Sequence, residues 1–313
     1  MAAPHVSVMI RGWDVRANTT GAQVIASAKL AEEVGLDGVL TGDHVTFCGF
    51  GFDGLQTLTA VAAATDRVTL KTGVYLLPLR HPVPVALQVA ALDQLSFGRF
   101  VFGVGIGGED PHEFTSCGVD PRFRGARCNE ALQIVRRLWT EDNVTFQGRH
   151  FDLHDVTLYP KPLGHVPIYI GGRSDAALRR AGRYGDGYTG IWQSLDRFCQ
   201  LQEVIAEAAV AAGRDPAAIE LGMQFWMAVD EDRSRAHKLV SRGMESTYRL
   251  PFDRFERYTP FGSAEEVAAF IAPYVEAGAK HVNLLPVQGS PEANVEAAAR
   301  VREALEASVG VSE

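Results

Sequence analysis

The pair Asp43-His44 carries the most chemically capable side chains in this chain of 313 residues. It directly follows a short apolar run at 38–41 that is typical of a buried strand. An imidazole at the end of a strand can take or give a proton near neutral pH, so His44 is a candidate acid, base or proton donor. A histidine that is bonded to a backbone carbonyl for purely structural reasons is the alternative, and the residues alone leave both open.

A glycine-rich run, Gly103-Val-Gly-Ile-Gly-Gly-Glu109, follows a later apolar segment and matches the G-x-G-x-x-G pattern. In dinucleotide-binding units this turn opens a helix at once. Here Glu109-Asp-Pro-His-Glu follows instead, and we expect the next helix only at 129–139. The run therefore favours glycines that let the backbone approach a ligand closely over a nicotinamide-binding turn, although a nicotinamide dehydrogenase stays open.

A third run, Gly171-Gly172-Arg173-Ser174, joins an apolar segment to an amphipathic one. Free N–H groups at the start of a helix hold phosphate well, and Arg173 would add positive charge. A tight turn with Ser174 as the N-cap of the helix is the ordinary alternative. Because barrels often bind phosphate in their later loops, we favour a phosphate site here.

Several other classes of site and partner lack support in the sequence. His150 and His154 flank Asp152, but we interpret them as a polar surface and expect no metal site. No H-E-x-x-H, Walker A or G-x-S-x-G motif is present. The formal net charge of −8 argues against a nucleic-acid partner.

Features that would direct the chain to a membrane or out of the cell are also absent from the sequence. There is no apolar run of about 18 residues, so we expect no membrane span. There is no secretory signal either, so we expect a cytoplasmic protein. Its four cysteines should then be reduced thiols: Cys48, Cys117, Cys128 and Cys199.

Short apolar runs that alternate with amphipathic stretches must position these residues. We expect strands at 5–10, 38–41, 68–74, 99–105, 167–170, 187–189, 220–229 and 281–285. We expect helices at 21–34, 55–64, 83–95, 129–139, 174–184, 195–212, 233–247 and 291–307, and one opened by a capping box at 263–266. Strict alternation implies a parallel sheet, and eight units close a (β/α)8 TIM barrel; an open doubly wound sheet is the alternative.

The region 144–158 interrupts the alternation after the fourth βα unit, and its β-forming residues around a glycine predict a hairpin excursion. No low-complexity linker divides the chain, so we expect one domain over residues 1–313. In such a barrel the active site lies on the loops that leave the strands at their C-terminal ends. Four aromatic residues at these positions are candidates for a substrate pocket, with plain core as the alternative: Trp13, Phe47, Trp192 and Trp226.

The blocks that contain these residues resemble the luciferase-like monooxygenase family. They are Thr41-Gly-Asp-His-Val, Thr72-Gly-Val-Tyr-Leu-Leu-Pro-Leu-Arg-His-Pro, Gly98-Arg-Phe-Val-Phe-Gly-Val-Gly-Ile-Gly, Arg124-Gly-Ala-Arg, Pro167-Ile-Tyr-Ile-Gly-Gly and Ala181-Gly-Arg-Tyr-Gly-Asp-Gly-Tyr. They run in the family's order from about residue 38 to residue 190, and they are specific together but weak one by one. The last third of the chain matches only in its pattern.

The resemblance implies a (β/α)8 barrel that holds the deazaflavin coenzyme F420 or, alternatively, reduced FMN. It implies His44 and Glu109 as catalytic residues and a non-proline cis peptide at Gly73-Val74. The cofactor-binding residues that it implies are Asp43, Gly73, Val74, Tyr75, Gly105, Gly107, Gly108, Gly171, Gly172, Arg173 and Ser174. We favour F420 because the chain is short for the family and its motifs are most similar to that branch.

The chemistry implied by the resemblance depends on the cofactor. With F420 we expect hydride transfer to or from a small organic substrate, and with FMN a two-component monooxygenase that uses oxygen. A separate flavin or F420 reductase as a partner and a homodimer are further expectations. A flavin-binding protein without catalysis is the remaining alternative, because a barrel and a pocket alone do not establish chemistry.

Overall fold

The computed structural model describes residues 3–10, 19–47, 51–108 and 110–310. Trp13, Glu109 and Cys48, which the sequence analysis singled out, lie outside these residues. No helix in the described ranges is long and apolar enough to cross a membrane. Within the same ranges, no three or more His, Cys, Asp or Glu residues are grouped so that they could hold a metal ion.

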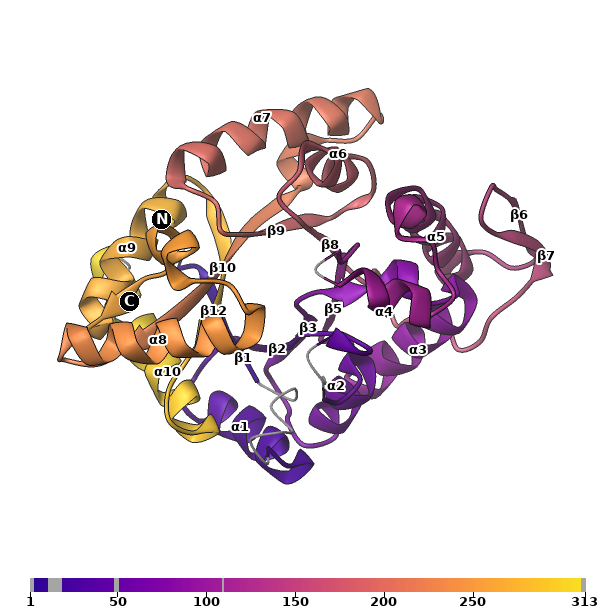
Figure 1. Ribbon diagram of the computed structural model, residues 1–313. Coiled ribbons are helices and arrows are strands. Elements are labelled where there is room, and N and C mark those ends of the chain that lie inside the picture. The colour runs from indigo at the N-terminus through magenta and orange to yellow at the C-terminus, as the bar shows by residue number, and fades with distance from the viewer. Residues whose placement is uncertain (1–2, 11–18, 48–50, 109, 311–313) are drawn as a thin grey trace.

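Eight parallel strands form a closed barrel (Figure 1). In their order around the barrel they are β1 (His5–Met9), β2 (Gly38–Thr41), β3 (Thr69–Thr72), β5 (Phe100–Gly105), β8 (Ile168–Gly171), β9 (Gly187–Ile191), β10 (Glu220–Val229) and β12 (Ala279–Pro286). The last strand pairs with the first, with Val6 opposite Val282 and Val8 opposite Leu284. The closed barrel is confirmed, and the open doubly wound sheet is wrong.

Helices surround the barrel and return the chain from each strand to the next (Figure 1). They are α1 (Gly21–Glu33), α2 (Gly54–Ala62), α3 (Pro82–Leu95), α5 (Arg124–Thr140), α6 (Asp175–Tyr184), α7 (Leu195–Ala211), α8 (Arg233–Tyr248), α9 (Ala264–Glu276) and α10 (Pro291–Ser308). The predicted capping box is present, because Ser263 accepts from the Glu266 N–H while the Glu266 carboxylate accepts from the Ser263 N–H. Thr20 and Gln23 form a second capping box at the start of α1.

Two short strands extend the ends of barrel strands. β4 (Tyr75–Leu76) pairs with β5, and β11 (Phe261–Gly262) pairs with β10. The segment 250–261, between α8 and α9, also contains two short 3-10 turns, Phe252–Arg254 and Glu256–Tyr258. These elements add to the C-terminal end of the barrel, where the site is expected.

The predicted excursion is confirmed as the antiparallel hairpin of β6 (Val144–Gln147) and β7 (Asp152–Val156). The expectation that no helix begins before residue 129 is wrong. A short helix, α4 (Pro111–Ser116), begins two residues after Glu109, and α5 already begins at Arg124. Asp110 caps α4 by accepting from the His112 N–H, and Pro111 occupies its first turn, where a missing N–H costs nothing.

One continuous hydrophobic core joins the barrel strands to the surrounding helices. Val8, Val39 and Phe102 from the strands share this core with Leu58 and Val89 from the helices. A second cluster, which includes Met9, Trp226 and Leu285, packs beneath the inner side of α8. The second cluster lies at the C-terminal end of the strands, so it reaches the expected position of the active site.

Candidate active site

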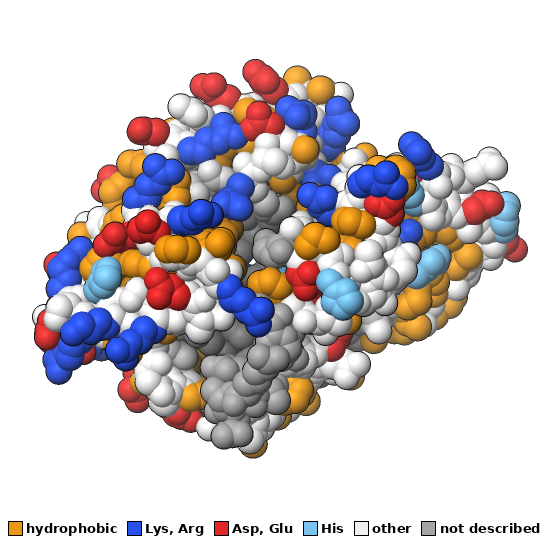
Figure 2. Space-filling view, in the orientation of Figure 1, with side chains coloured by type: hydrophobic (Ala, Val, Ile, Leu, Met, Phe, Trp, Pro, Cys, Tyr) orange, Lys and Arg blue, Asp and Glu red, His pale blue; other side chains and the backbone are white. Residues whose placement is uncertain are grey.

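A pocket opens at the C-terminal end of the barrel, where this fold places its active sites. Its empty volume, with the open solvent at its mouth included, is about 1070 Å³. Figure 2 shows a hollow near the centre of this face, with hydrophobic side chains on both sides of it.

Most of the residues predicted for the site line this one pocket. They are Asp43, His44, Phe47, Gly73, Val74, Gly105, Gly107, Gly171, Gly172, Arg173, Trp192 and Trp226. Tyr75, Gly108 and Ser174 were also predicted but do not line it. The pocket adds several residues that the sequence analysis did not select: Met9, Gly42, Leu76, Ile106, Thr189, Ile191, Gln224, Thr247, Tyr248 and Leu285.

The two halves of the pocket differ in character, and the strand order explains why. β3, β5 and β8 are neighbours in the barrel and contribute the glycines. β9, β10, β12 and β1 complete the ring and contribute large apolar side chains. His44 follows β2, which lies between the two arcs (Figure 1).

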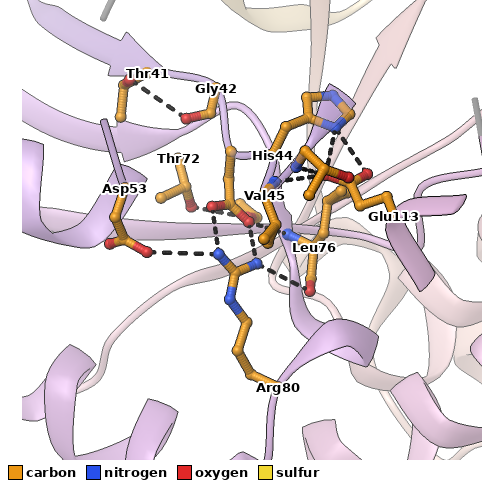
Figure 3. A network of polar contacts seen from close by, with 12 residues as sticks. Thr41, Gly42, His44, Val45, Asp53, Thr72, Leu76, Arg80 and Glu113 are labelled. Atoms are coloured by element: carbon orange, nitrogen blue, oxygen red, sulfur yellow. Dashed lines mark hydrogen bonds and ion pairs between the residues drawn. The ribbon is translucent and has the colours of Figure 1, made fainter. Parts of the chain in front are cut away.

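Asp43 is a buried residue in the wall of the pocket. Its carboxylate accepts from both terminal nitrogens of Arg80, at 2.5 and 2.8 Å, and from the Leu76 N–H at 2.9 Å. Burial raises the pKa of Asp43, while the Arg80 guanidinium and the Leu76 N–H oppose that rise. Arg80 also lies over the ring of Tyr75, 4.4 Å from its centroid. It forms a second ion pair with Asp53 (Figure 3). Asp43 thus ties the end of β2 to the segment that follows β3.

His44 is held by a carboxylate that comes from α4. Its Nδ1 lies 3.0 Å from Glu113 Oε2, and its ring stacks on Phe47 with the centroids 4.7 Å apart. Figure 3 shows the Glu113 side chain directed at the imidazole. An Nδ1–H that donates to Glu113 leaves Nε2 as the acceptor in the neutral ring. This is the arrangement of a histidine base that is oriented by a carboxylate.

Glu113 is almost completely buried and remains an anion. Burial acts to raise its pKa, but the hydrogen bond from His44 and those from the Val45 and Thr46 N–H groups hold the pKa below its ordinary value. The sequence analysis assigned the catalytic acid to Glu109, which lies outside the described residues, and missed Glu113. The signal that could have found it was Asp110-Pro111, a helix start that places Glu113 in the first turn.

The Gly73-Val74 peptide bond is cis, as the resemblance implied. The side chain of Val74 lies between the ends of β5 and β8. A Cβ on Gly105 would lie 2.4 Å from Val74 Cγ2, and one on Gly171 would lie 2.8 Å from Val74 Cγ1. Glycine is therefore required at both positions to make room for Val74. Gly105 thus has a packing role that the sequence did not show, while its role in close approach to a ligand stays a prediction.

The run Gly171–Ser174 forms the turn from β8 into α6. Gly172 has a φ of +133°, and Tyr188 donates a hydrogen bond to its carbonyl. Ser174 is the N-cap of α6, as its alternative interpretation predicted, and its hydroxyl oxygen accepts from the Ala177 N–H. Arg173 lines the pocket and lies over the ring of Trp192 at 5.0 Å. The turn thus brings a cation and a helix N-terminus to the edge of the pocket.

Two further arginines, one on α5 and one on α6, each have a buried donor nitrogen that no hydrogen bond uses among the described residues. Arg124 lies next to Gly108, where a Cβ would be 3.5 Å from its Nε, and Arg180 contacts the Gly125 carbonyl. Arg124 Nε and Arg180 Nη1 are buried and have no hydrogen-bond partner among the described residues. Buried donors of this kind are normally satisfied. Neither arginine lines the pocket, and Arg124 is the one that lies beside a glycine of the β5 loop.

Comparison with known proteins places the chain in a family. Residues 5–259 match the model of the luciferase-like monooxygenases. An F420-dependent glucose-6-phosphate dehydrogenase of Kineococcus radiotolerans is 33% identical over 282 residues, which cover 80% of this chain and 83% of that protein. The chain therefore belongs to the luciferase-like monooxygenase family.

Two solved structures are similar over nearly the whole chain. An F420-dependent secondary alcohol dehydrogenase in complex with an F420-acetone adduct superposes with a TM-score of 0.86 at 25% identity, covering 97% of this chain and 99% of that one. The monooxygenase RslO1 from Streptomyces bottropensis superposes with a TM-score of 0.79 at 26% identity, covering 97% and 98%. Both cofactor chemistries expected from the sequence, deazaflavin oxidoreductase and monooxygenase, thus occur among proteins similar to this chain.

Proposed function

We propose that this protein is an F420-dependent oxidoreductase that interconverts an alcohol and its carbonyl compound. The observation that carries this proposal is the His44–Glu113 pair at the boundary between the two halves of the pocket. Oxidation of an alcohol needs a base for the hydroxyl proton, and this pair supplies one. The dehydrogenase named above and the alcohol dehydrogenase structure support the same chemistry.

The glycine half of the pocket fits the deazaflavin. Val74 and the glycines at the ends of β3, β5 and β8 would hold its ring system, and Arg173 would hold its anionic groups. When bound, the deazaflavin supplies a two-electron hydride acceptor or donor. The protein supplies position and electrostatics around that chemistry.

His44 would move the proton that accompanies the hydride. In alcohol oxidation its Nε2 takes the hydroxyl proton, and Glu113 stabilises the imidazolium that forms. In carbonyl reduction the same atom returns the proton. Phe47 stacks on the ring and limits its rotation. The role of Glu109 as a further acid stays a prediction.

Further properties of the protein follow from the resemblance as proposals. We expect a single domain over residues 1–313, a homodimer in the cytoplasm, and a separate flavin or F420 reductase as a partner. Size-exclusion chromatography with light scattering measures the oligomeric state directly. A strictly monomeric protein at all concentrations would contradict the homodimer.

The decisive variant for the proposed chemistry is His44→Ala. We expect turnover with F420 to fall by about 10²–10⁴-fold, because the base is lost, while F420 affinity stays nearly unchanged. His154→Ala is a matched control, since His154 is exposed on the β6–β7 hairpin away from the pocket. Normal turnover in His44→Ala would refute the role of the base.

A further inference from the structure

The apolar half of the pocket carries information about the substrate. Its lining comes from β9, β10, β12, β1 and the end of α8, and it faces the glycine half across the barrel. We define the aromatic wall as Trp192, Trp226, Tyr248 and Phe255. Assigning the aromatic wall to the substrate rests on the proposed function, in which F420 occupies the glycine half.

Edge-to-face and tilted contacts hold the aromatic wall together. The ring of Trp192 lies 4.8 Å from those of both Tyr248 and Phe255, and the ring of Trp226 lies 5.7 Å from that of Tyr248. Trp226 and Phe255 are buried. Aromatic pairs at these separations attract one another, so the wall is a fixed apolar surface.

Aliphatic side chains line the pocket next to the aromatic wall. Met9, Ile191 and Leu285 line the pocket from three different strands. Met9 and Leu285 belong to the same buried cluster as Trp226, and Ile191 packs against it. A ligand on this side therefore meets apolar carbon over most of its surface.

Charged groups are scarce on this side of the pocket. Among the described residues that line the pocket, the only Asp, Glu, Lys or Arg side chains are Asp43 and Arg173. Asp43 is committed to Arg80, and Arg173 lies beside the turn assigned to the anionic part of the cofactor. A phosphate monoester would need compensating cations that the described residues of the apolar half do not provide.

Polar partners for a sugar are single groups within apolar surroundings. Among the described residues on this side they are the side chains of Thr189, Gln224, Thr247 and Tyr248 and the indole N–H groups of Trp192 and Trp226, and the Thr189 hydroxyl already accepts weakly from Gln224. Each sugar hydroxyl that is buried without a partner costs about 1–3 kcal/mol. A substrate with one oxygen near His44 and apolar groups elsewhere avoids this cost.

We infer that the apolar half takes an uncharged hydrophobic alcohol, or the ketone or aldehyde formed from it, and not a phosphorylated sugar. The apolar group of the alcohol would lie on the aromatic wall, with its hydroxyl toward His44. In the reaction the alcohol loses a hydride from its carbinol carbon to the deazaflavin and its hydroxyl proton to His44. Its C–O bond becomes C=O, and His44 later releases the proton to water.

The test compares substrates on the F420-loaded protein. Loss of the F420 absorbance is followed with 1-phenylethanol, 2-propanol, glucose and glucose 6-phosphate. We expect kcat/KM for 1-phenylethanol to exceed that for 2-propanol by roughly tenfold or more, because the phenyl group is buried on the aromatic wall. We expect glucose and glucose 6-phosphate to give no measurable turnover.

A pair of tyrosine variants tests the position of the substrate. Tyr248→Ala should raise KM for 1-phenylethanol by roughly tenfold, change KM for 2-propanol much less, and leave the F420 dissociation constant unchanged. Tyr258→Ala is the matched control, because Tyr258 ends the 3-10 turn Glu256–Tyr258 and does not line the pocket. Equal effects of the two variants on both alcohols would overturn the inference.

The outcomes separate this inference from the proposed function. If F420 binds and glucose 6-phosphate is oxidised with a higher kcat/KM than either alcohol, the inference is overturned while the F420 assignment stands. The same holds if F420 binds but neither alcohol is oxidised and neither corresponding ketone is reduced. If F420 does not bind, the proposed function itself fails.

Discussion

A single carboxylate, Glu113, does two things for the candidate base. It accepts from the imidazole of His44 and also from the Val45 and Thr46 N–H groups of the same loop. The three bonds fix both the ring and the backbone that carries it. With Nδ1 as the donor to Glu113, Nε2 is the acceptor nitrogen of the neutral imidazole.

Replacing Glu113 with Gln tests this pairing at the scale of one residue. The amide keeps a similar shape but loses the negative charge that stabilises the imidazolium. We expect kcat for alcohol oxidation to fall by roughly 10²-fold or more, while KM changes little, as happens when the carboxylate that orients a catalytic histidine is lost. Steady-state kinetics with F420 in excess gives both constants.

A matched control for this variant exists on α5, facing the hairpin. Glu130 is another carboxylate that accepts from several backbone N–H groups, those of Arg149, His150 and Phe151, but it does not line the pocket. Glu130→Gln should therefore leave kcat unchanged. Wild-type kcat in Glu113→Gln, or an equal loss in both variants, would show that the charge of Glu113 does not serve the reaction.

At the scale of the elements, three strand ends meet around one side chain. Val74 follows β3 and fills the space beside Gly105 of β5 and Gly171 of β8. None of these strands could carry a larger residue there without displacing the others. The glycine half of the pocket is thus built by close packing of neighbouring strand ends.

Gly105→Ala measures the packing of these strand ends. The new methyl group would press on Val74, so we expect a loss of about 1–3 kcal/mol in the free energy of unfolding. Removing the obstacle in the double variant Gly105→Ala/Val74→Ala should recover part of that loss. Urea unfolding monitored by tryptophan fluorescence gives the values.

The control for the packing prediction is Gly164→Ala. A Cβ at Gly164 would meet nothing within 4 Å, so the added methyl should be nearly neutral. If Gly105→Ala were as stable as Gly164→Ala, the contact between the strand ends would not be tight in solution.

At the scale of the whole molecule, the two ends of the barrel have different polar groups. The N-terminal end encloses Lys71, which is buried and lies 3.2 Å from His5 Nδ1 and 3.3 Å from His281 Nδ1. Beyond it, Glu220 accepts from Tyr169 and contacts His281. Burial lowers the pKa of Lys71 to about 7 and that of His5 to about 3. Above pH 7 both groups are therefore mostly neutral.

The lowered pKa of Lys71 makes stability depend on pH. The ordinary pKa of 10.5 applies in the unfolded chain, so between about pH 7 and 10.5 the unfolded state binds more protons than the folded state. The contribution of Lys71 to stability therefore rises with pH over this window, by up to about 1.4 kcal/mol per pH unit. Lys71→Met should remove this part of the slope and leave the rest.

Unfolding in urea at several pH values between 7 and 10 checks this prediction. The unfolding free energy of Lys71→Met minus that of wild type should be largest at pH 7 and fall as the pH rises. A difference that is constant with pH would mean that Lys71 keeps its proton in the folded protein. Groups that titrate equally in both proteins cancel in this comparison.

The sequence predicts the fold better than the site, for a physical reason. Each βα unit is encoded locally, so the eight strands and the hairpin could be found from periodicity and turn residues. Strand ends also converge on one face, which brought His44, Trp192 and Trp226 to the pocket as expected. In contrast, the contact between His44 and Glu113 joins residues 69 positions apart through a helix of six residues, too short to show periodicity.

The role of the glycines could not be read from the sequence either. Gly105 was predicted to allow close approach of the backbone to a ligand and Gly171 to form a phosphate-binding turn, and both also make room for Val74. Only the packing of three strands shows this. Motifs therefore located the pocket, while the tertiary contacts assigned what each residue does.

The most direct test of the account is a binding titration of the purified protein with F420 and, separately, with oxidised and reduced FMN. Quenching of cofactor or tryptophan fluorescence reports occupancy of a pocket lined by Trp192 and Trp226. We expect saturable binding of one F420 per chain, which excess FMN does not displace. Tight binding of FMN in either redox state, with no binding of F420, would contradict the account.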